Sequence, residues 1–256
     1  MSASVLRGLS ASIVSVIYCF STSLGMSLTK KLLFQPPEEY VEDSSIYHNN
    51  DNCWLKIKCE NDTDTIVIFL HGNASDITMN KNFGKVLSQI GDVYIPEYSG
   101  YGAMRKLFPR RSSDVIMDCL RTFFDTVISE ENGKNICIVG QSLGSHYAAR
   151  LASEGYCTHL CMISPFYSLE KLAFGFDCEK RKIDAYDTEK YIHVLRDPIN
   201  LLILHGKKDT IVPCKHAVAL YDSSILKNKK VRLMTDSCHS SLNLDAVSKE
   251  IVLFCA

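Results

Sequence analysis

The stretch "ICIVGQSLGSHYAARLA", from Ile136 to Ala152, carries the pattern that decides the fold. An apolar run ends at Gly140, one serine follows between two glycines, and apolar residues at helical spacing come next. A continuous apolar run bounded by turn residues is typical of a strand covered on both faces. The pattern predicts a strand over 135–140, a sharp turn at Ser142 and a helix over 142–154.

The remainder of the chain repeats this alternation of strand and helix. Short apolar or alternating runs predict strands at 53–59, 65–72, 92–96, 159–164, 200–206 and 231–235. Helical spacing predicts helices over 112–132 and 216–226 and from about residue 241, with Ser112 or Ser113 as the N-cap of the first. Such alternation predicts an α/β fold with a mainly parallel sheet and helices on both faces.

The composition indicates one sizeable domain, over residues 35–256. Of the 256 residues, 46% are hydrophobic, which is enough for a single large core. The formal net charge is −1, with acidic and basic residues mixed along the chain. This charge balance predicts no nucleic-acid partner.

The N-terminal segment, residues 1–34, differs from the domain. Residues 8–29 contain no charged side chain and approach the ~20 residues of a membrane helix, although serine and threonine moderate their hydropathy. The segment is an uncleaved anchor, a cleaved signal peptide or an amphipathic surface segment, and these are the three alternatives. We favour the anchor, and hence a protein associated with a membrane surface, because no small-x-small cleavage site follows; a cytoplasmic protein is the alternative. The polar residues 35–45 follow as a linker.

The cysteines indicate a reducing compartment. There are eleven, an odd number, and no CxxC pair predicts a zinc or redox motif. Cys137 and Cys161 lie inside apolar runs, where cysteine packs as a small hydrophobic residue. We expect mostly free thiols, and neither a metal nor an organic cofactor.

The serine between the glycines fits the G-x-S-x-G nucleophile elbow, "GQSLG" over 140–144. A serine hydroxyl needs a base, and that base needs an orienting acid. Asp209 follows one predicted strand in "HGKKDTIVP" and His239 follows the next in "DSCHSS". The chain order serine, acid, histidine predicts that Ser142, Asp209 and His239 form a catalytic triad.

Other residues compete for these roles. Asp236 is an alternative acid, and among the other seven histidines His146 lies one helical turn after the serine. A tetrahedral intermediate also needs two N–H donors. We predict the backbone N–H of Leu143 as one, and that of Asn73, or alternatively Ala74, in the loop "LHGNASD" as the other.

Six segments together resemble the α/β-hydrolase superfamily: "HGNASD", "EYSGYG", "GQSLG", "ISPF", "HGKKDTIVP" and the late histidine. They are most similar to the group containing the α/β-hydrolase-domain-containing proteins 13 and 17 and the bem46-like proteins. The similarity covers roughly residues 60–245. It implies an α/β-hydrolase fold with a minimal cap, and Ser142 as nucleophile, Asp209 as acid and His239 as base.

The resemblance implies a serine hydrolase that cleaves acyl esters or thioesters, with lipid-like or S-acylated substrates. One branch of the group removes palmitate from cysteines and carries an N-terminal cysteine cluster, whereas Cys19 stands alone here, which favours the membrane-anchored branch. Aromatic residues between 165 and 198 either line an acyl pocket or simply cover the sheet. A non-catalytic scaffold and a serine peptidase are the alternative functions.

Overall fold

The computed structural model describes residues 35–37, 40, 43–108, 112–131, 133–177, 186–239 and 243–255. The predicted N-terminal anchor, residues 1–34, lies outside the described residues. Within them, no helix is both long enough and apolar enough to cross a bilayer. The nine cysteines of the described residues are all free thiols, as the sequence predicts.

The core of the fold is one eight-stranded sheet with the order β1-β2-β4-β3-β5-β6-β7-β8. Strand β2 pairs antiparallel with both β1 and β4, and all the other neighbouring strands pair parallel, which confirms the mainly parallel sheet. The strands are β1 (Ile46–His48), β2 (Cys53–Ile57), β3 (Thr65–Leu70), β4 (Asp92–Pro96), β5 (Asn135–Gln141), β6 (His159–Ile163), β7 (Asn200–Gly206) and β8 (Lys229–Met234).

The central strands are buried on both faces. In β3, Ile66, Ile68 and Leu70 join one hydrophobic cluster, while the intervening Val67 and Phe69 join the other. All five side chains are fully buried. Because successive strand residues point to opposite faces, only a continuous apolar run satisfies both clusters. Each such side chain stabilises the fold by about 1.5–3 kcal/mol relative to exposure.

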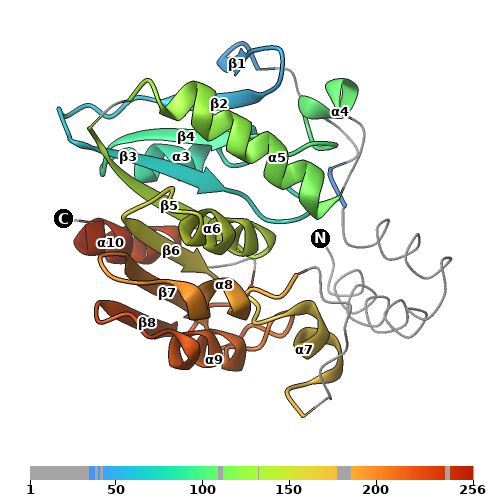
Figure 1. The fold of residues 1–256 in the computed structure, drawn as a ribbon, viewed down its shortest axis with the longest axis vertical. Helices are drawn as coiled ribbons and strands as arrows, with labels where there is room; N and C mark the ends of the chain where they lie inside the picture. The colour runs from blue at the N-terminus through green and yellow to red at the C-terminus, as the bar shows by residue number, and fades with distance from the viewer. Residues whose placement is uncertain are drawn as a thin grey trace, which may run out of the picture.

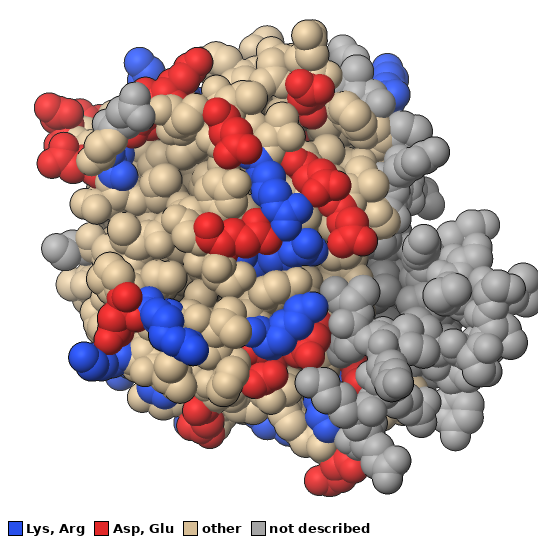
Figure 2. Space-filling view, in the orientation of Figure 1, with Lys and Arg blue, Asp and Glu red and all other residues tan. Residues whose placement is uncertain are grey.

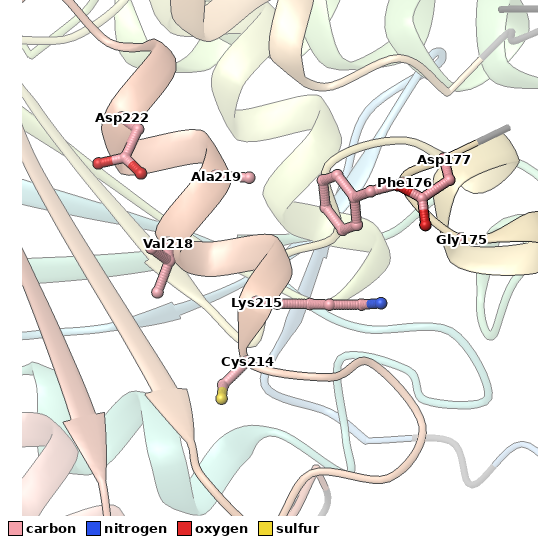
Figure 3. A pocket seen from close by; sticks show the side chains of 8 residues that line it. All are labelled: Gly175, Phe176, Asp177, Cys214, Lys215, Val218, Ala219 and Asp222. Atoms are coloured by element: carbon pink, nitrogen blue, oxygen red, sulfur yellow. The ribbon is translucent and has the colours of Figure 1, made fainter. Parts of the chain in front are cut away.

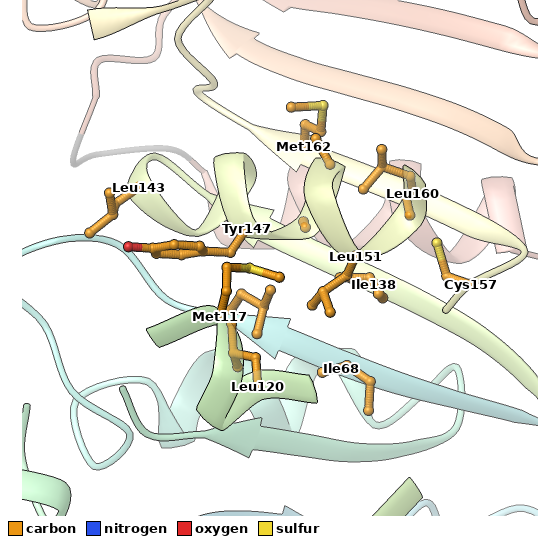
Figure 4. Packing of buried hydrophobic residues seen from close by; sticks show 14 of the residues in the cluster. Ile68, Met117, Leu120, Ile138, Leu143, Tyr147, Leu151, Cys157, Leu160 and Met162 are labelled. Atoms are coloured by element: carbon orange, nitrogen blue, oxygen red, sulfur yellow. The ribbon is translucent and has the colours of Figure 1, made fainter. Parts of the chain in front are cut away.

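Helices cover both faces of the sheet (Figure 1). Those of the first face pack on the larger cluster, part of which Figure 4 shows between α5, α6 and the neighbouring strands. On the opposite face α3 and α10 contact each other and cover the second cluster. The helices are α3 (Lys81–Leu87), α4 (Met104–Leu107), α5 (Ser113–Phe123), the π-helix η1 (Phe124–Ile128), α6 (Leu143–Ser153), α7 (Leu169–Phe174), α8 (Glu189–Val194), α9 (Lys215–Ser223) and α10 (Leu244–Cys255).

The helix predicted over 112–132 forms as α5 followed by the π-helical turns of η1. Ser112 is its N-cap, and the hydroxyl oxygen accepts a hydrogen bond from the Val115 N–H at 3.3 Å. The Arg121 guanidinium on α5 pairs with the Glu154 carboxylate at the end of α6, at 2.6 Å.

Acidic and basic side chains lie next to one another over this face of the molecule (Figure 2).

Several predicted boundaries were wrong by a few residues. The strand predicted at 231–235 begins at Lys229 instead. It lies at the edge of the sheet, where one side of the ladder is open to solvent, so that charged residues such as Lys229 can belong to the strand. The last helix begins at Leu244 rather than at 241. The three-residue strand β1 was not predicted, since its pairing with β2 depends on a partner and not on its own pattern. In the described part of the segment 165–198, the helices are the short α7 and α8.

Candidate active site

Ser142 occupies a strained turn between β5 and α6. Its backbone angles are φ 52° and ψ −112°, a region that L-residues rarely adopt. This conformation costs on the order of 1–3 kcal/mol and is maintained by its surroundings. The Ser142 N–H donates to the Ile163 carbonyl at 2.8 Å, and the Ser145 hydroxyl donates to the Gly140 carbonyl at 2.8 Å.

The two glycines of the motif are required by close approach. A Cβ at Gly140 would lie 2.6 Å from the Gly144 carbonyl oxygen. A Cβ at Gly144 would lie only 2.1 Å from the carbonyl oxygen of Leu70, at the end of β3. Any side chain at either position would push α6 away from the sheet. The turn that exposes Ser142 therefore depends on both glycines.

His239 connects Ser142 to Asp209. The Nε2 atom of His239 lies 3.1 Å from Ser142 Oγ, and its Nδ1 atom lies 2.7 Å from Asp209 Oδ2. Since a carboxylate only accepts, Nδ1 carries the proton, and the lone pair of Nε2 faces the serine hydroxyl. The His239 side chain is 16% exposed, whereas that of Asp209 is fully buried. This arrangement can remove a proton from Ser142.

Asp209 is fixed as an ionised acceptor. Its Oδ1 accepts from the N–H groups of Ile211, at 3.0 Å, and Val212, at 2.8 Å. Its Oδ2 accepts from His239 and lies 3.2 Å from Nε2 of the buried His205. Burial by itself raises the pKa of Asp209, but the hydrogen bonds from His205 and His239 outweigh it and hold that pKa well below its usual range.

The loops that carry the acid and the histidine meet at another glycine. A Cβ at Gly206, the last residue of β7, would lie 2.2 Å from the Ser237 carbonyl oxygen. The Lys208 N–H also donates to that carbonyl, at 3.0 Å. This contact holds the two loops together.

The loop after β3 lies against the serine. The position of a Cβ on Gly72 is 3.6 Å from the Cβ of Ser142. The Asn73 side chain is tied down, because its Oδ1 accepts from the Tyr101 hydroxyl at 2.7 Å and from the Gln35 N–H at 3.0 Å. Leu143, the other predicted donor, is the first residue of α6, where backbone N–H groups have no acceptor within the helix.

A buried pair that the sequence analysis did not identify supports this loop. Nε2 of His71 lies 2.9 Å from Glu97 Oε1, and both side chains are fully buried. The same carboxylate accepts from the N–H groups of Ile77, at 3.3 Å, and Tyr98, at 3.1 Å. A glutamate at the end of an apolar strand, in "VYIPEYSGYG", was the available signal. Glu97 thus anchors both ends of the loop 71–77.

The competing residues lie elsewhere. Asp236 is exposed and pairs with Lys208 at 2.8 Å. His146 is fully buried, with Nδ1 3.2 Å from the Thr188 hydroxyl and its ring among aromatic side chains. Burial, together with the nearby positive charge of Arg150 and Lys190, lowers the pKa of His146 to about 3.

A surface hollow lies between α9 and the chain that follows α7 (Figure 3). Its volume is 540 Å³, and Phe176, Lys215 and Val218 are among the residues that line it. The Phe176 ring packs at 5.4 Å from that of Tyr167 and 4.9 Å from that of His216. None of the five predicted site residues lines this hollow, so it is separate from the serine.

Comparisons with known proteins agree with this architecture. The family described as "Serine aminopeptidase, S33" matches residues 61–180. The chain is 27% identical over 215 residues to "Uncharacterized protein R595" of Acanthamoeba polyphaga mimivirus, covering 73% of each chain. It is 28% identical over 172 residues to human "Alpha/beta hydrolase domain-containing protein 17C", covering 65% of this chain and 50% of that protein. It therefore spans half the length of that human relative.

Solved structures share the fold. A soluble variant of the monoglyceride lipase from Saccharomyces cerevisiae superposes with a TM-score of 0.66 and 14% identity, over 86% of this chain and 98% of that one. Est1E from Butyrivibrio proteoclasticus superposes with a TM-score of 0.59 and 17% identity, over 84% and 96%. Together with the family match, these likenesses confirm the predicted α/β-hydrolase fold.

Proposed function

We propose that this chain, which is similar to α/β-hydrolases in sequence and fold, is a serine hydrolase that cleaves acyl esters or thioesters. The observation that carries the proposal is a pair of contacts made by His239. Its Nε2 lies 3.1 Å from Ser142 Oγ, and its Nδ1 lies 2.7 Å from Asp209 Oδ2. Three residues far apart in sequence converge with the donor and acceptor order that nucleophilic catalysis by serine requires.

In the proposed reaction, Ser142 Oγ attacks the acyl carbonyl while His239 Nε2 takes its proton. Asp209 stays ionised and holds the imidazole in the tautomer that leaves Nε2 free to accept. His239 then donates that proton to the departing alcohol or thiol. A water activated by the same Nε2 attacks the acyl-enzyme, and the carboxylic acid leaves. No metal or organic cofactor enters these steps.

The negative charge that develops on the carbonyl oxygen needs two fixed donors. We assign this role to the backbone N–H groups of Leu143 and Asn73. The close approach of Gly72 to Ser142 supports this assignment, as does the position of Leu143 at the positive end of the α6 dipole. Losing one such donor typically costs on the order of 10²–10³ in kcat.

The acyl part of the substrate is proposed from the relatives. The human relative is named an α/β-hydrolase domain-containing protein, and the yeast structure is of a monoglyceride lipase, which acts on an acyl ester. The matched family is instead described as an aminopeptidase, which keeps amide hydrolysis as the second candidate. Esters, thioesters and amides share the same tetrahedral chemistry, so only turnover distinguishes them.

The test is a substrate panel on the purified full chain. It comprises p-nitrophenyl acyl esters of increasing chain length, acyl thioesters and aminoacyl p-nitroanilides. We expect ester or thioester turnover that Ser142→Ala and His239→Ala both abolish, while the matched controls Ser153→Ala and His193→Ala retain it. Turnover of the anilides alone would replace the proposal with the peptidase. No turnover by a folded protein, for any of these substrates, would favour the scaffold.

We also propose that the protein acts at a membrane surface through residues 1–34, with its domain in a reducing compartment. The uncharged segment 8–29 and the many free thiols support this. Vesicle flotation of the full chain, beside a chain that lacks residues 1–34, tests the first part. We expect only the full chain to float with the vesicles, and equal flotation of both would contradict the proposal.

A further inference from the structure

Three cysteines from distant parts of the chain meet on the face of the sheet opposite α6. They are Cys137 on β5, Cys161 on β6 and Cys255 in the last turn of α10. The Sγ atom of Cys137 lies 4.0 Å from that of Cys161 and 3.1 Å from that of Cys255. All three sulfur atoms lie within 4.8 Å of one another.

The fold explains this convergence. Cys137 and Cys161 both point into the cluster under α3 and α10, because alternate residues of β5 and β6 face that side. Both are fully buried, and Cys255 is half-buried at the edge of the cluster. Since 24 and 118 residues separate Cys137 from its two partners, no spacing motif in the sequence reveals the group.

We propose that Cys137, Cys161 and Cys255 bind one soft, thiophilic metal ion, of the class of Zn²⁺ and Cu(I). Metal–thiolate bonds are about 2.3 Å long, so an ion in the plane of three sulfurs holds them roughly 4.0 Å apart. Cys137 and Cys161 already have this separation. Cys255 would move outward by about 0.9 Å, a shift within reach of a half-buried side chain at the end of a helix.

Three neighbouring thiols can supply the ligands that such an ion needs. Thiolates, not thiols, are the ligands, so bound metal must displace protons. Metal entry forms three sulfur–metal bonds and releases the thiol protons to solvent.

The ion's role is structural. Cys137 lies on β5, five residues before Ser142, which corresponds to about 16 Å along an extended strand. A bound ion would thus lie apart from the serine, and would join the end of α10 to the two strands beneath it. Because the unfolded chain does not hold these three sulfurs together, the ion would stabilise the folded state by mass action.

The test uses the reduced, metal-free full chain titrated with Cd²⁺, which reports thiolate coordination by ultraviolet charge-transfer absorption. Zn²⁺ competition and a Cu(I) titration against bicinchoninate identify the preferred ion. We expect saturation at one equivalent, with a rise in Tm on the order of 5 °C at a hundredfold excess over Kd. Cys255→Ser should abolish both, whereas the control Cys238→Ser, which changes an exposed thiol, should retain both.

Cys255→Ser alters only the last turn of the last described helix, so its circular dichroism should match that of the wild type. Cys161→Ala is the second test of the same ligand set. A saturable band that persists in folded Cys255→Ser would overturn the proposal, since it would then arise from other thiols. Reduced wild-type protein without such a band would overturn it equally.

Discussion

Acidification should destabilise this protein through a histidine one turn beyond the proposed nucleophile. His146 is fully buried, and its pKa is lowered to about 3 by burial and by the charges of Arg150 and Lys190. In the unfolded chain the pKa returns to about 6.5. Between these two values the unfolded chain binds more protons than the folded one. Stability is therefore fully present above pH 6.5 and falls as the pH falls toward 3.

The size of the effect follows from the two pKa values. At pH 5 His146 alone removes about 2 kcal/mol of the free energy of unfolding, and below pH 3 the loss approaches about 5 kcal/mol. His216, whose pKa burial lowers to about 4, adds a similar loss at pH 5. The wild type should thus lose about 4 kcal/mol between pH 7.5 and pH 5, before the depressed carboxylates begin to titrate.

His146→Phe keeps a ring among Phe166 and Tyr191 and removes the titrating group. Urea unfolding at pH 7.5 and pH 5.0 measures the difference. The variant should lose about 2 kcal/mol less than the wild type between these two pH values, even if loss of the contact with Thr188 lowers its stability at both. The exposed control, His193→Gln, should follow the wild type. If His146→Phe shows the full wild-type loss, or if NMR finds His146 titrating near pH 6.5, the reasoning is refuted.

Three substitutions test the site itself. Gly144→Ala places a Cβ 2.1 Å from the Leu70 carbonyl oxygen. We expect the free energy of unfolding, measured in urea, to fall by more than about 3 kcal/mol. An unchanged urea midpoint would contradict the packing described. Asp209→Asn should reduce kcat about 10⁴-fold with the fold retained, because the amide cannot hold His239 in its tautomer. The control Asp236→Asn should leave turnover unchanged. If Asp236→Asn were the more damaging of the two, Asp236 would be the acid. Glu97→Gln should lower kcat between about 10- and 100-fold with little change in KM, because it loosens the loop 71–77. An unchanged kcat would show that this loop does not contribute to the reaction.

Much of the fold could be predicted from local patterns. The apolar run of β3 indicates a strand covered on both faces, and the glycines around Ser142 indicate a tight turn, because each pattern reflects the residue's own surroundings. The nucleophile-elbow motif, the chain order and the position of Asp209 and His239 after predicted strands together indicated the group with Ser142, since parallel strands end at one edge of the sheet.

The features that were missed depend on long-range contacts. The role of Glu97 depends on contacts of its carboxylate with His71 and with two backbone N–H groups, which no local pattern reveals. Cys255 lies 118 residues from Cys137, so only the packing of α10 on the sheet brings them together. The edge strand β1 likewise has no pattern of its own, and forms through its partner.

The central claim is that Ser142 is an activated nucleophile, and fluorophosphonate labelling tests it most directly. The probe forms a covalent adduct only with a serine whose proton is removed by a base. The account predicts one adduct, located on Ser142 by peptide mass spectrometry, that disappears in His239→Ala and persists in His193→Ala. A folded wild-type protein that takes up no probe, or an adduct on another serine, would contradict it.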